Sequence, residues 1–386
     1  MREMVIVGAA ETKFGRSDLS YRELAVEAGR KAMEDAGVDA SRIESLVLGS
    51  FSPGTFIHQE HVAPLVASEL GLDHVPSTRT ENACASGATA VMSGLMQIGA
   101  GMHEVVLVVG VEKMTSTPIG EATSILAEAA DWESEAKAGL TFPGVYALMA
   151  RAYMHKYGKD RSMLDAVAVK AHGNGVGNPY AQFRKAITID DVRDSMMIAD
   201  PLTLYDCSPI SDGAAAIVLA AKDVAGQFKR PGIPFLGFGQ ASDALALHER
   251  DEITSLPAAQ RAAERAYKMS GIGPGDISIA EVHDCFTIAE IIATEDLGFF
   301  DPGTGGDAAI SGKTGRDGTI PVNPSGGLKA KGHPVGASGV GQIVESVFQL
   351  RGEAEGRQVD GVDYALTHNV GGSGATCVVT ILGRGK

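Results

Sequence analysis

The chain is poor in the residues that build disulfide-rich, metal-stabilised or membrane-spanning proteins. It has only four cysteines, at positions 84, 207, 285 and 377. Their wide spacing matches neither a disulfide framework nor a paired Cys-x-x-Cys zinc site. No apolar run reaches the roughly 18 residues of a membrane helix, and the start of the chain has no basic, apolar export signal. We therefore expect a protein of the reducing cytoplasm, without a membrane span or a resident metal.

Positive charge is also scarce. The chain has 33 lysines and arginines against 48 acidic residues, for a net charge of −15. This balance argues against a nucleic-acid-binding protein. An anionic ligand would need local cations to offset the overall field. Lys329 and Lys331 are candidates for that role, although solvated surface charges are an equally good interpretation.

Glycine, in contrast, is abundant. The 48 glycines are about 12% of the chain, against a usual value of about 7%. Such an excess indicates tight turns and close approaches between backbones. With 386 residues and 44% hydrophobic content, the chain is long enough to bury one large core or two smaller ones.

The sequence contains an internal duplication. Residues 21–51 predict a helix that ends at Gly37 and a following strand, and the same pattern returns about 234 residues later in 258–285. The matched positions in the second copy are Ala262 for Ala28, Ala266 for Ala32, Gly271 for Gly37 and Ile277 for Ile43. Chance similarity between common patterns would explain one such pair, but two more pairs follow in the same order.

The second pair matches the helix starts Ser86-Gly87 and Ser338-Gly339, each followed by a buried strand, at 104–110 and 362–368. The third matches 212–219 with 373–380. Alternating strands and helices predict an α/β fold. We expect a first half at 1–116 and 201–228, an inserted loop domain at 117–200 and a second half at 229–386. Within the second half, the Gly- and Asp-rich segment 301–320 predicts an exposed loop.

Cys84 is the strongest candidate for a catalytic residue. It lies among small residues at the expected start of a helix, in Glu81-Asn82-Ala83-Cys84-Ala85-Ser86-Gly87-Ala88. Free N–H groups and the helix dipole at such a start favour a thiolate, which is the nucleophile of acyl-transfer chemistry. A small buried packing residue is the alternative interpretation.

Histidines in three other segments are possible partners. His333 lies in a glycine-rich turn before the second-half helix, where its near-neutral pKa suits a base. His283 and Cys285 follow a strand and point the same way, because alternate strand residues share a face. His368 and Asn369 begin a glycine loop, 368–374, that can bring backbone N–H groups close to a ligand. If the halves pack about a pseudo-twofold axis, the starts of the two helices converge and bring Cys84 and His333 together.

The remaining cysteines and histidines are weaker candidates for functional residues. Cys207 and Cys377 lie in or near apolar strand runs and predict packing residues. His58 and His61 have the spacing of metal ligands, but they lack an acidic or cysteine partner, so we expect surface or interface histidines.

Together, the motifs resemble the thiolase superfamily over essentially the whole chain. The segments that carry the resemblance are 81–88, 283–286, 332–334 and 368–374. The form His283-Asp284-Cys285-Phe286 is similar to the sterol-carrier-protein-type branch, where commoner thiolases have Asn-Glu-Ala-Phe. The overall run is most similar to archaeal-type acetyl-CoA acetyltransferases. The resemblance implies the thiolase fold, with two αβαβα halves related by a pseudo-twofold axis and an inserted loop domain.

The resemblance also implies a mechanism. His333 would activate Cys84, which takes an acyl group from a thioester, and Cys285 would move the proton of the α-carbon. His283 and His333 would bind the thioester oxygen in one oxyanion hole. A second oxyanion hole would use the backbone N–H groups of Cys84, Val370 and Gly371. Many thiolases have a cysteine where this chain has His368, so His368 either tunes Cys285 or packs.

The implied activity is formation or cleavage of acetoacetyl-CoA in lipid metabolism, as in the mevalonate pathway. CoA and acyl-CoA would be substrates rather than permanent cofactors, with Lys329, Lys331 and Arg184 as candidate CoA contacts. Two alternatives are a thiolase for a larger, aromatic or branched, 3-ketoacyl-CoA and a non-catalytic acyl-CoA- or lipid-binding scaffold subunit. An intact set of Cys84 and its partners argues against the scaffold.

The family also implies partners. The resemblance implies a homodimer or homotetramer, and a complex with a small zinc-ribbon/OB-fold protein or with hydroxymethylglutaryl-CoA synthase. The strand at 104–110 either packs across such a dimer interface or is a core strand, since its composition fits both.

Overall fold

The order of the strands mirrors itself about a central pair. In the computed structural model, which describes residues 2–385, one mixed sheet has the order β3-β2-β4-β7-β1-β8-β11-β10-β9. The strands of the first half are β1 (Met4–Glu11), β2 (Ser45–Gly49), β3 (Ser77–Thr80), β4 (Val105–Glu112) and β7 (Gly213–Ala221). The strands of the second half are β8 (Ile233–Ser242), β9 (Ile279–Val282), β10 (Tyr364–Gly371) and β11 (Thr376–Gly383).

The pairing directions repeat as well as the order. In each half two antiparallel pairs are followed by a parallel pair: β1 with β7, β7 with β4 and β4 with β2, then β8 with β11, β11 with β10 and β10 with β9. The first half adds a further parallel pair, β2 with β3. The halves join where β1 pairs antiparallel with β8, at Val5 and Ile6. The duplication inferred from the sequence is therefore present in the sheet.

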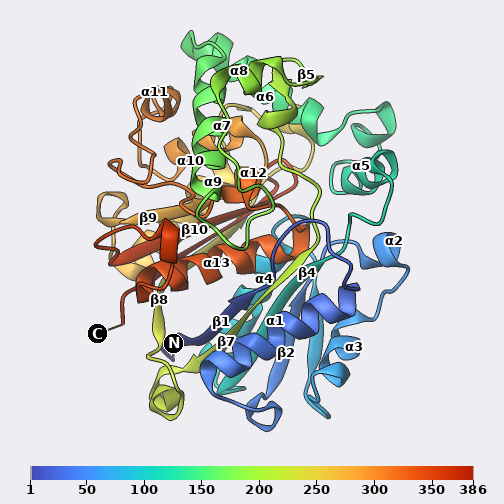
Figure 1. Ribbon diagram of the computed structural model, residues 1–386, viewed down its shortest axis with the longest axis vertical. Helices are drawn as coiled ribbons and strands as arrows, with labels where there is room; N and C mark the ends of the chain where they lie inside the picture. Colours follow the sequence, from blue (N-terminus) through green and yellow to red (C-terminus); the bar gives the residue numbers. More distant parts are fainter. Residues whose placement is uncertain (1, 386) are drawn as a thin grey trace.

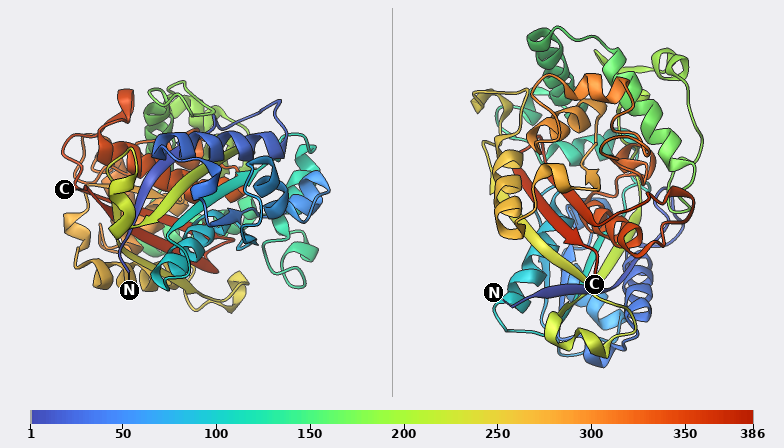
Figure 2. Two further views of the ribbon diagram at one scale, coloured as in Figure 1. Left: turned by 90° about the horizontal axis from the view of Figure 1, so that it is seen from below. Right: turned by 90° about the vertical axis from the view of Figure 1, so that its left-hand side faces the viewer.

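Helices cover the sheet in layers, as Figures 1 and 2 show. In the first half, α1 (Tyr21–Ala36) covers the outer face together with α3 (Val62–Glu69). In the second half, α9 (Pro257–Ser270) covers the outer face. Between the halves lie α4 (Ser86–Gly99) and α13 (Val335–Arg351), whose apolar side chains form a core with both parts of the sheet.

Both faces of β4 are buried. Val105, Leu107 and Val109 pack toward α1, while Val106 and Val108 pack toward α4 and α13. A strand covered on both faces needs a continuous apolar run, which explains Val-Val-Leu-Val-Val. Because β4 lies between β2 and β7, it is a core strand and not an interface strand.

The outer helices end as their sequences predict. The hydroxyl of Ser20 caps α1, and Glu23 completes a capping box. Gly37 and Gly271 close α1 and α9 in left-handed conformations, with φ of 72° and 70°. The two helices thus share the closing glycine as well as their place on an outer face.

The segment between β4 and β7 is mostly helical and gathers at the end of the molecule opposite α1 and α3 (Figure 1). It contains α5 (Ile119–Ala127), α6 (Phe142–Tyr157), α7 (Ser162–Gly175), α8 (Ile189–Asp194) and the small hairpin β5 (Met197–Ala199) and β6 (Leu202–Thr203). The exact boundaries predicted for this insertion and for the two halves stay predictions.

The remaining short helices are α2 (Pro53–Ile57), α10 (Thr287–Asp296), α11 (Gly305–Ile310) and α12 (Gly327–Ala330). The prediction of an exposed loop at 301–320 was wrong for its first part, because α11 forms there. Gly305 and Gly306 are buried, and an added Cβ on Gly306 would lie 3.0 Å from Met163. These glycines permit close packing rather than exposure. Over residues 2–385, no helix is long and apolar enough to cross a membrane.

Candidate active site

The starts of the two central helices meet through glycines. A Cβ added to Gly87 would lie 2.6 Å from the carbonyl oxygen of Gly336, and one added to Gly339 would lie 2.5 Å from the amide nitrogen of Ala88. No other residue type allows so close an approach. The helices therefore bring together the residues just before them, Cys84 and His333, from opposite halves of the chain.

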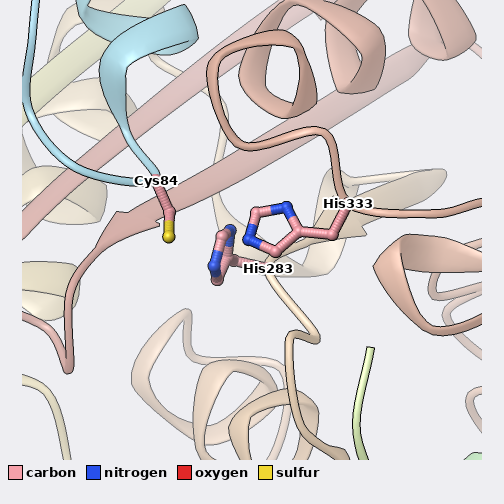
Figure 3. Close-up of side chains that lie close together, drawn as sticks. All are labelled: Cys84, His283 and His333. Carbon is pink, nitrogen blue, oxygen red and sulfur yellow. The ribbon is translucent and has the colours of Figure 1, made fainter. Parts of the chain in front are cut away.

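His283 completes this cluster at the end of β9. The sulfur of Cys84 and one ring nitrogen from each of His283 and His333 all lie within 4.8 Å of one another. Figure 3 shows the three side chains pointing into one space. The two imidazole rings stand nearly perpendicular, with an interplanar angle of 83° and 5.1 Å between centroids. Both histidines are buried, and Cys84 is half-buried. The juxtaposition expected from the duplication is therefore present.

A tight turn holds Cys84. Ala83 has φ of 50°, a left-handed conformation that is uncommon for a residue other than glycine. The amide of Asn82 donates to Ser86 Oγ at 2.9 Å, and Ser86 Oγ donates to the carbonyl of Ala83 at 2.6 Å. These bonds fix the backbone on both sides of the thiol, just ahead of α4.

Burial determines the protonation state of this thiol. It raises the pKa of Cys84 to about 12; the backbone N–H of Gly372 opposes this rise and the charge of Glu112 adds to it. The prediction that the helix start lowers this pKa was wrong, because desolvation outweighs the effect of the helix. The thiol is neutral in the free protein, so it requires a base at the moment of attack.

The tautomer of His333 makes it that base. Its Nδ1 lies 2.6 Å from Ser338 Oγ, and the Ser338 hydroxyl also donates to the carbonyl of Pro334 at 2.9 Å. Because this hydroxyl has one proton, Nδ1 must carry the hydrogen of the Nδ1–Oγ bond. Nε2 is then left with a free lone pair. Burial lowers the pKa of His333 to about 3, so the ring is neutral and can accept a proton.

His283 has the opposite tautomer. The amide Nδ2 of Asn369 lies 3.1 Å from His283 Nδ1 and donates to it. The ring proton is therefore on Nε2. This buried N–H has no hydrogen-bond partner among residues 2–385. Burial and the neighbouring His333 and His368 lower the pKa of His283, so the ring stays neutral. A neutral donor without a partner suits a developing negative charge on a substrate oxygen.

Cys285 lies beside the same cavity. Its thiol is buried, its carbonyl accepts a hydrogen bond from the amide of Ser208 at 2.9 Å, and burial raises its pKa. The hydroxyl of Tyr146 donates to the carbonyl of Gly372 at 3.2 Å, and its proximity to the thiol of Cys285 opposes the rise of that pKa. Tyr146 also stacks on Phe286 at 4.6 Å between ring centroids. Tyr146 comes from the inserted segment, and no motif in the sequence pointed to it.

The glycine loop after β10 packs directly on the turn of the nucleophile. A Cβ on Gly371 would lie 2.5 Å from the carbonyl oxygen of Asn82, and the backbone N–H of Gly372 faces the sulfur of Cys84 closely enough to oppose the rise of its pKa. This amide belongs to the same loop, 370–372, as the predicted pair Val370 and Gly371. The oxyanion role of Val370, Gly371 and the Cys84 amide stays a prediction.

His368 is packed inside the second half. It is fully buried on the face of β10 that also carries Leu366 and Val370, and burial lowers its pKa to about 4. Neither ring nitrogen has a hydrogen-bond partner in the part of the chain that the structure describes. These observations favour packing over direct chemistry.

The two lysines near His333 are not surface charges. Lys329 is 1% exposed and its Nζ donates to the carbonyl of Cys207, while Lys331 is 5% exposed and its Nζ lies 2.8 Å from Glu11 Oε2. Both ammonium groups are bound by the protein, so the prediction that they contact CoA was wrong. Arg184 is exposed, and its CoA contact stays a prediction.

Glu112 is a further residue that sequence reasoning missed. Its buried carboxylate accepts hydrogen bonds from the amides of Phe51 at 2.8 Å and Gly336 at 3.0 Å. Burial raises its pKa to about 7. It lies at the end of β4, a run otherwise without charge, and this contrast was an available signal.

A largely apolar cavity of about 400 Å³ opens onto the cluster. Its walls come from both halves and from the insertion, and include Phe51, Cys84, Ile119, Leu126, Phe142, Tyr146, Ile198, Leu204, Cys207, Cys285, Phe286, His333 and Val335. A thiol and a neutral imidazole base in the wall of an apolar cavity, with the N–H of His283 beside them, define an enzyme that carries an acyl group on sulfur.

The chain belongs to the thiolase family. The family model described as "Thiolase, N-terminal domain" matches residues 4–223, and "Thiolase C-terminal domain-like" matches residues 239–384. An acetyl-CoA acetyltransferase of Methanothermobacter thermautotrophicus is 49% identical over 385 residues, covering 100% of both chains. Sterol carrier protein 2 of Bos taurus is 36% identical, over 98% of this chain and 72% of its own. The resemblance and the thiolase fold inferred from the motifs are thus confirmed, and the protein is an acyltransferase.

A solved structure agrees. The chain described as Ltp2-ChsH2(DUF35) aldolase superposes with a TM-score of 0.87 at 28% identity, covering 100% of this chain and 98% of that one.

Proposed function

We propose that this enzyme is an acetyl-CoA C-acetyltransferase that forms or cleaves acetoacetyl-CoA through an acyl-Cys84 intermediate. The observation that carries the proposal is the pair of opposite tautomers, which places a proton acceptor and a proton donor beside one thiol. The 49% identity to a full-length acetyl-CoA acetyltransferase supports the choice of acyl group.

In the first half-reaction, His333 Nε2 takes the proton of Cys84 as the sulfur attacks the thioester carbon of acetyl-CoA. The thioester oxygen becomes negative and accepts a hydrogen bond from His283 Nε2–H. When the tetrahedral intermediate collapses, the C–S bond to CoA breaks and His333 returns its proton to the leaving thiolate. The result is acetyl-Cys84, free CoA and a neutral His333.

In the second half-reaction, Cys285 first releases its thiol proton to solvent, which returns it at the end of the cycle, and then, as a thiolate, removes a proton from the methyl carbon of a second acetyl-CoA. The enolate attacks the carbonyl of acetyl-Cys84 and forms the new carbon–carbon bond. Backbone N–H groups at Cys84 and in the 370–372 loop would bind the negative oxygen of this second intermediate. Cys84 then leaves, and Cys285 supplies the proton that restores its thiol.

The nucleophile is tested by CoA-dependent cleavage of acetoacetyl-CoA. We expect Cys84→Ala to lose activity by at least about 10³-fold, since Cys84 is the thiol that lies within 4.8 Å of the neutral imidazole of His333. Cys377→Ala removes a buried thiol on β11, opposite Val370 and outside the cluster of Cys84, His283 and His333. This variant should retain most of the activity and controls for the removal of a buried thiol. Equal rates in wild type and Cys84→Ala would end the proposal.

The division of labour between the thiols is tested with Cys285→Ala. This variant should still form acetyl-Cys84, seen as a mass increase of the intact protein, but should fail to make acetoacetyl-CoA. A variant without the acyl adduct would show that Cys285 acts in the first step and would overturn its assignment.

A larger 3-ketoacyl-CoA is a second candidate substrate, and the apolar cavity of about 400 Å³ favours it. Rates with acetoacetyl-CoA and with branched or aromatic 3-ketoacyl-CoA decide between them. Arg184, exposed on the inserted segment, remains our candidate CoA contact, to be tested by the KM of Arg184→Ala.

We further propose a cytoplasmic homodimer or homotetramer with a small zinc-ribbon/OB-fold partner or hydroxymethylglutaryl-CoA synthase. The solved relative carries two protein names, Ltp2 and ChsH2(DUF35), which supports a second protein beside the thiolase chain. Copurification from native cells and the mass of the purified enzyme in solution test these assemblies.

A further inference from the structure

The Cys84, His283 and His333 side chains have the chemistry of a zinc site. One sulfur and two imidazole nitrogens within 4.8 Å of one another are the donors that Zn²⁺ takes in proteins. Tetrahedral Zn²⁺ would hold such donors about 3.3–3.6 Å apart, from bond lengths of about 2.0–2.1 Å to nitrogen and 2.3 Å to sulfur. Side-chain rotations that shorten the longest separation by about 1 Å are sufficient.

Both histidine rings are held in place through Nδ1. A ligating histidine usually binds a second group through its other ring nitrogen, which fixes the ring. His333 Nδ1 is bound to Ser338 Oγ at 2.6 Å, and His283 Nδ1 to Asn369 at 3.1 Å. In both rings Nε2 is the nitrogen left over, and in His283 it is buried without a hydrogen-bond partner among residues 2–385.

His283 must change its tautomer to bind a metal, and its neighbour allows this. The ring proton would move from Nε2 to Nδ1, which then needs an acceptor. Asn369 Oδ1 is buried and also lacks a partner within residues 2–385. A flip of this side-chain amide would present Oδ1 to Nδ1–H, so the exchange replaces one hydrogen bond with another.

We propose that Zn²⁺ binds reversibly to Cys84, His283 and His333 and inhibits the enzyme. Binding forms one Zn–S and two Zn–N bonds and releases the thiol proton of Cys84 to solvent, with water in the fourth position. The ion would occupy the nucleophile, its base and the oxyanion donor at once. The cavity gives it a path, and the net charge of −15 favours the approach of a cation. This proposal rests on the geometry and not on which acyl-CoA the enzyme uses.

Direct binding tests the proposal without any turnover. Zn²⁺ is titrated calorimetrically into purified enzyme in a buffer that does not chelate metals, and Co²⁺ is used as a spectroscopic probe. We expect one tight site with a Kd below about 1 μM and a thiolate-to-cobalt charge-transfer band. Cys84→Ser should weaken binding at least about 100-fold and lose the band. Ser338→Ala should weaken it about 10- to 100-fold through the orientation of His333.

Two controls make the result specific. His61→Ala removes an exposed histidine near His58, and we expect this variant to bind Zn²⁺ with the same affinity as wild type. Wild-type enzyme alkylated at Cys84 with iodoacetamide should lose the site, which gives an answer even if Cys84→Ser folds poorly. The same affinity in wild type, Cys84→Ser and alkylated enzyme, or no binding below about 100 μM Zn²⁺, would overturn the proposal.

Discussion

At the scale of single residues, the site depends on hydrogen bonds that fix where protons lie. Ser338 leaves a free lone pair on His333, and Asn369 leaves a free N–H on His283. Two histidines in similar surroundings thus have opposite roles. The identities of the histidines were readable from the sequence, but their tautomers depend on contacts that only the folded chain shows.

Ser338→Ala tests this assignment. Without the hydroxyl, His333 is free to carry its proton on Nε2, where it cannot accept one from Cys84. We expect acetylation of Cys84 to slow about 10- to 100-fold, measured by quenched-flow mass spectrometry of the intact enzyme. Ser346→Ala is a matched control, since Ser346 lies on the same helix and its hydroxyl donates to the carbonyl of Gln342 at 2.9 Å without touching a histidine. Equal slowing in both variants would assign the effect to the helix and not to the tautomer.

At the scale of elements, glycines determine how closely the central helices approach. The sequence predicted both helix starts and their convergence, because each has a small-residue start and a buried strand after it. It did not show that Gly339 lies against Ala88 and Asn369. These two residues are about 250 and 30 positions away from Gly339 in the sequence, so no local pattern links them.

Gly339→Ala tests that packing. The added Cβ would lie 2.4 Å from Asn369 Oδ1 and 2.5 Å from the amide nitrogen of Ala88, so the helices must separate. We expect a loss of about 1–3 kcal/mol in the free energy of unfolding and a lower kcat, measured by urea denaturation and steady-state kinetics. Gly173→Ala, in α7 with no atom within 4 Å of the added Cβ, should be neutral or stabilise by up to about 1 kcal/mol. A fully active and stable Gly339→Ala would contradict the close packing.

The inserted segment contains a buried histidine that makes the stability of the protein depend on pH. His172 is buried, with its ring 5.6 Å from Phe183 and 5.3 Å from Tyr205. Burial, and then the charge of Lys329, lower its pKa to about 4. A histidine with a lowered pKa takes up a proton only on unfolding, so its contribution to stability is complete above about pH 6.5 and is lost as the pH falls toward 4.

His172→Phe keeps an aromatic ring but removes this proton uptake. Between pH 7.5 and pH 5, wild type should lose about 2 kcal/mol more stability than the variant. Denaturant titrations at the two pH values measure the difference, in which the contributions of all other groups cancel. Parallel losses in both proteins would mean that His172 is not shielded from solvent.

At the scale of the whole molecule, the mirrored halves were predictable because duplication leaves the same pattern twice in the sequence. The partners of the buried charged side chains could not be predicted from the sequence. The Glu11 side chain comes from the first strand and meets Lys331 from the last third of the chain, so no local pattern joins them. Lys331 therefore looked like a candidate for binding an anion until the fold supplied its partner.

Lys331→Met distinguishes a lysine that pairs with Glu11 from one that binds an anionic ligand. The ion pair with Glu11 is nearly inaccessible to water, with side-chain exposures of 6% and 0%, and Glu345 adds negative charge nearby. Removing the lysine leaves the buried carboxylate with only the more distant charge of Arg357 to offset it, which costs about 3–5 kcal/mol. The double variant Glu11→Leu/Lys331→Met should recover most of this stability in urea denaturation.

The loss in the single variant should also depend on pH. Burial already raises the pKa of Glu11, and Lys331 opposes that rise, so removing the lysine raises this pKa further. A raised carboxyl pKa costs stability as the pH increases through it, so Lys331→Met should lose more stability at pH 8 than at pH 5.5. If Lys331→Met instead kept full stability and only raised the KM for CoA, the lysine would face the ligand and not Glu11.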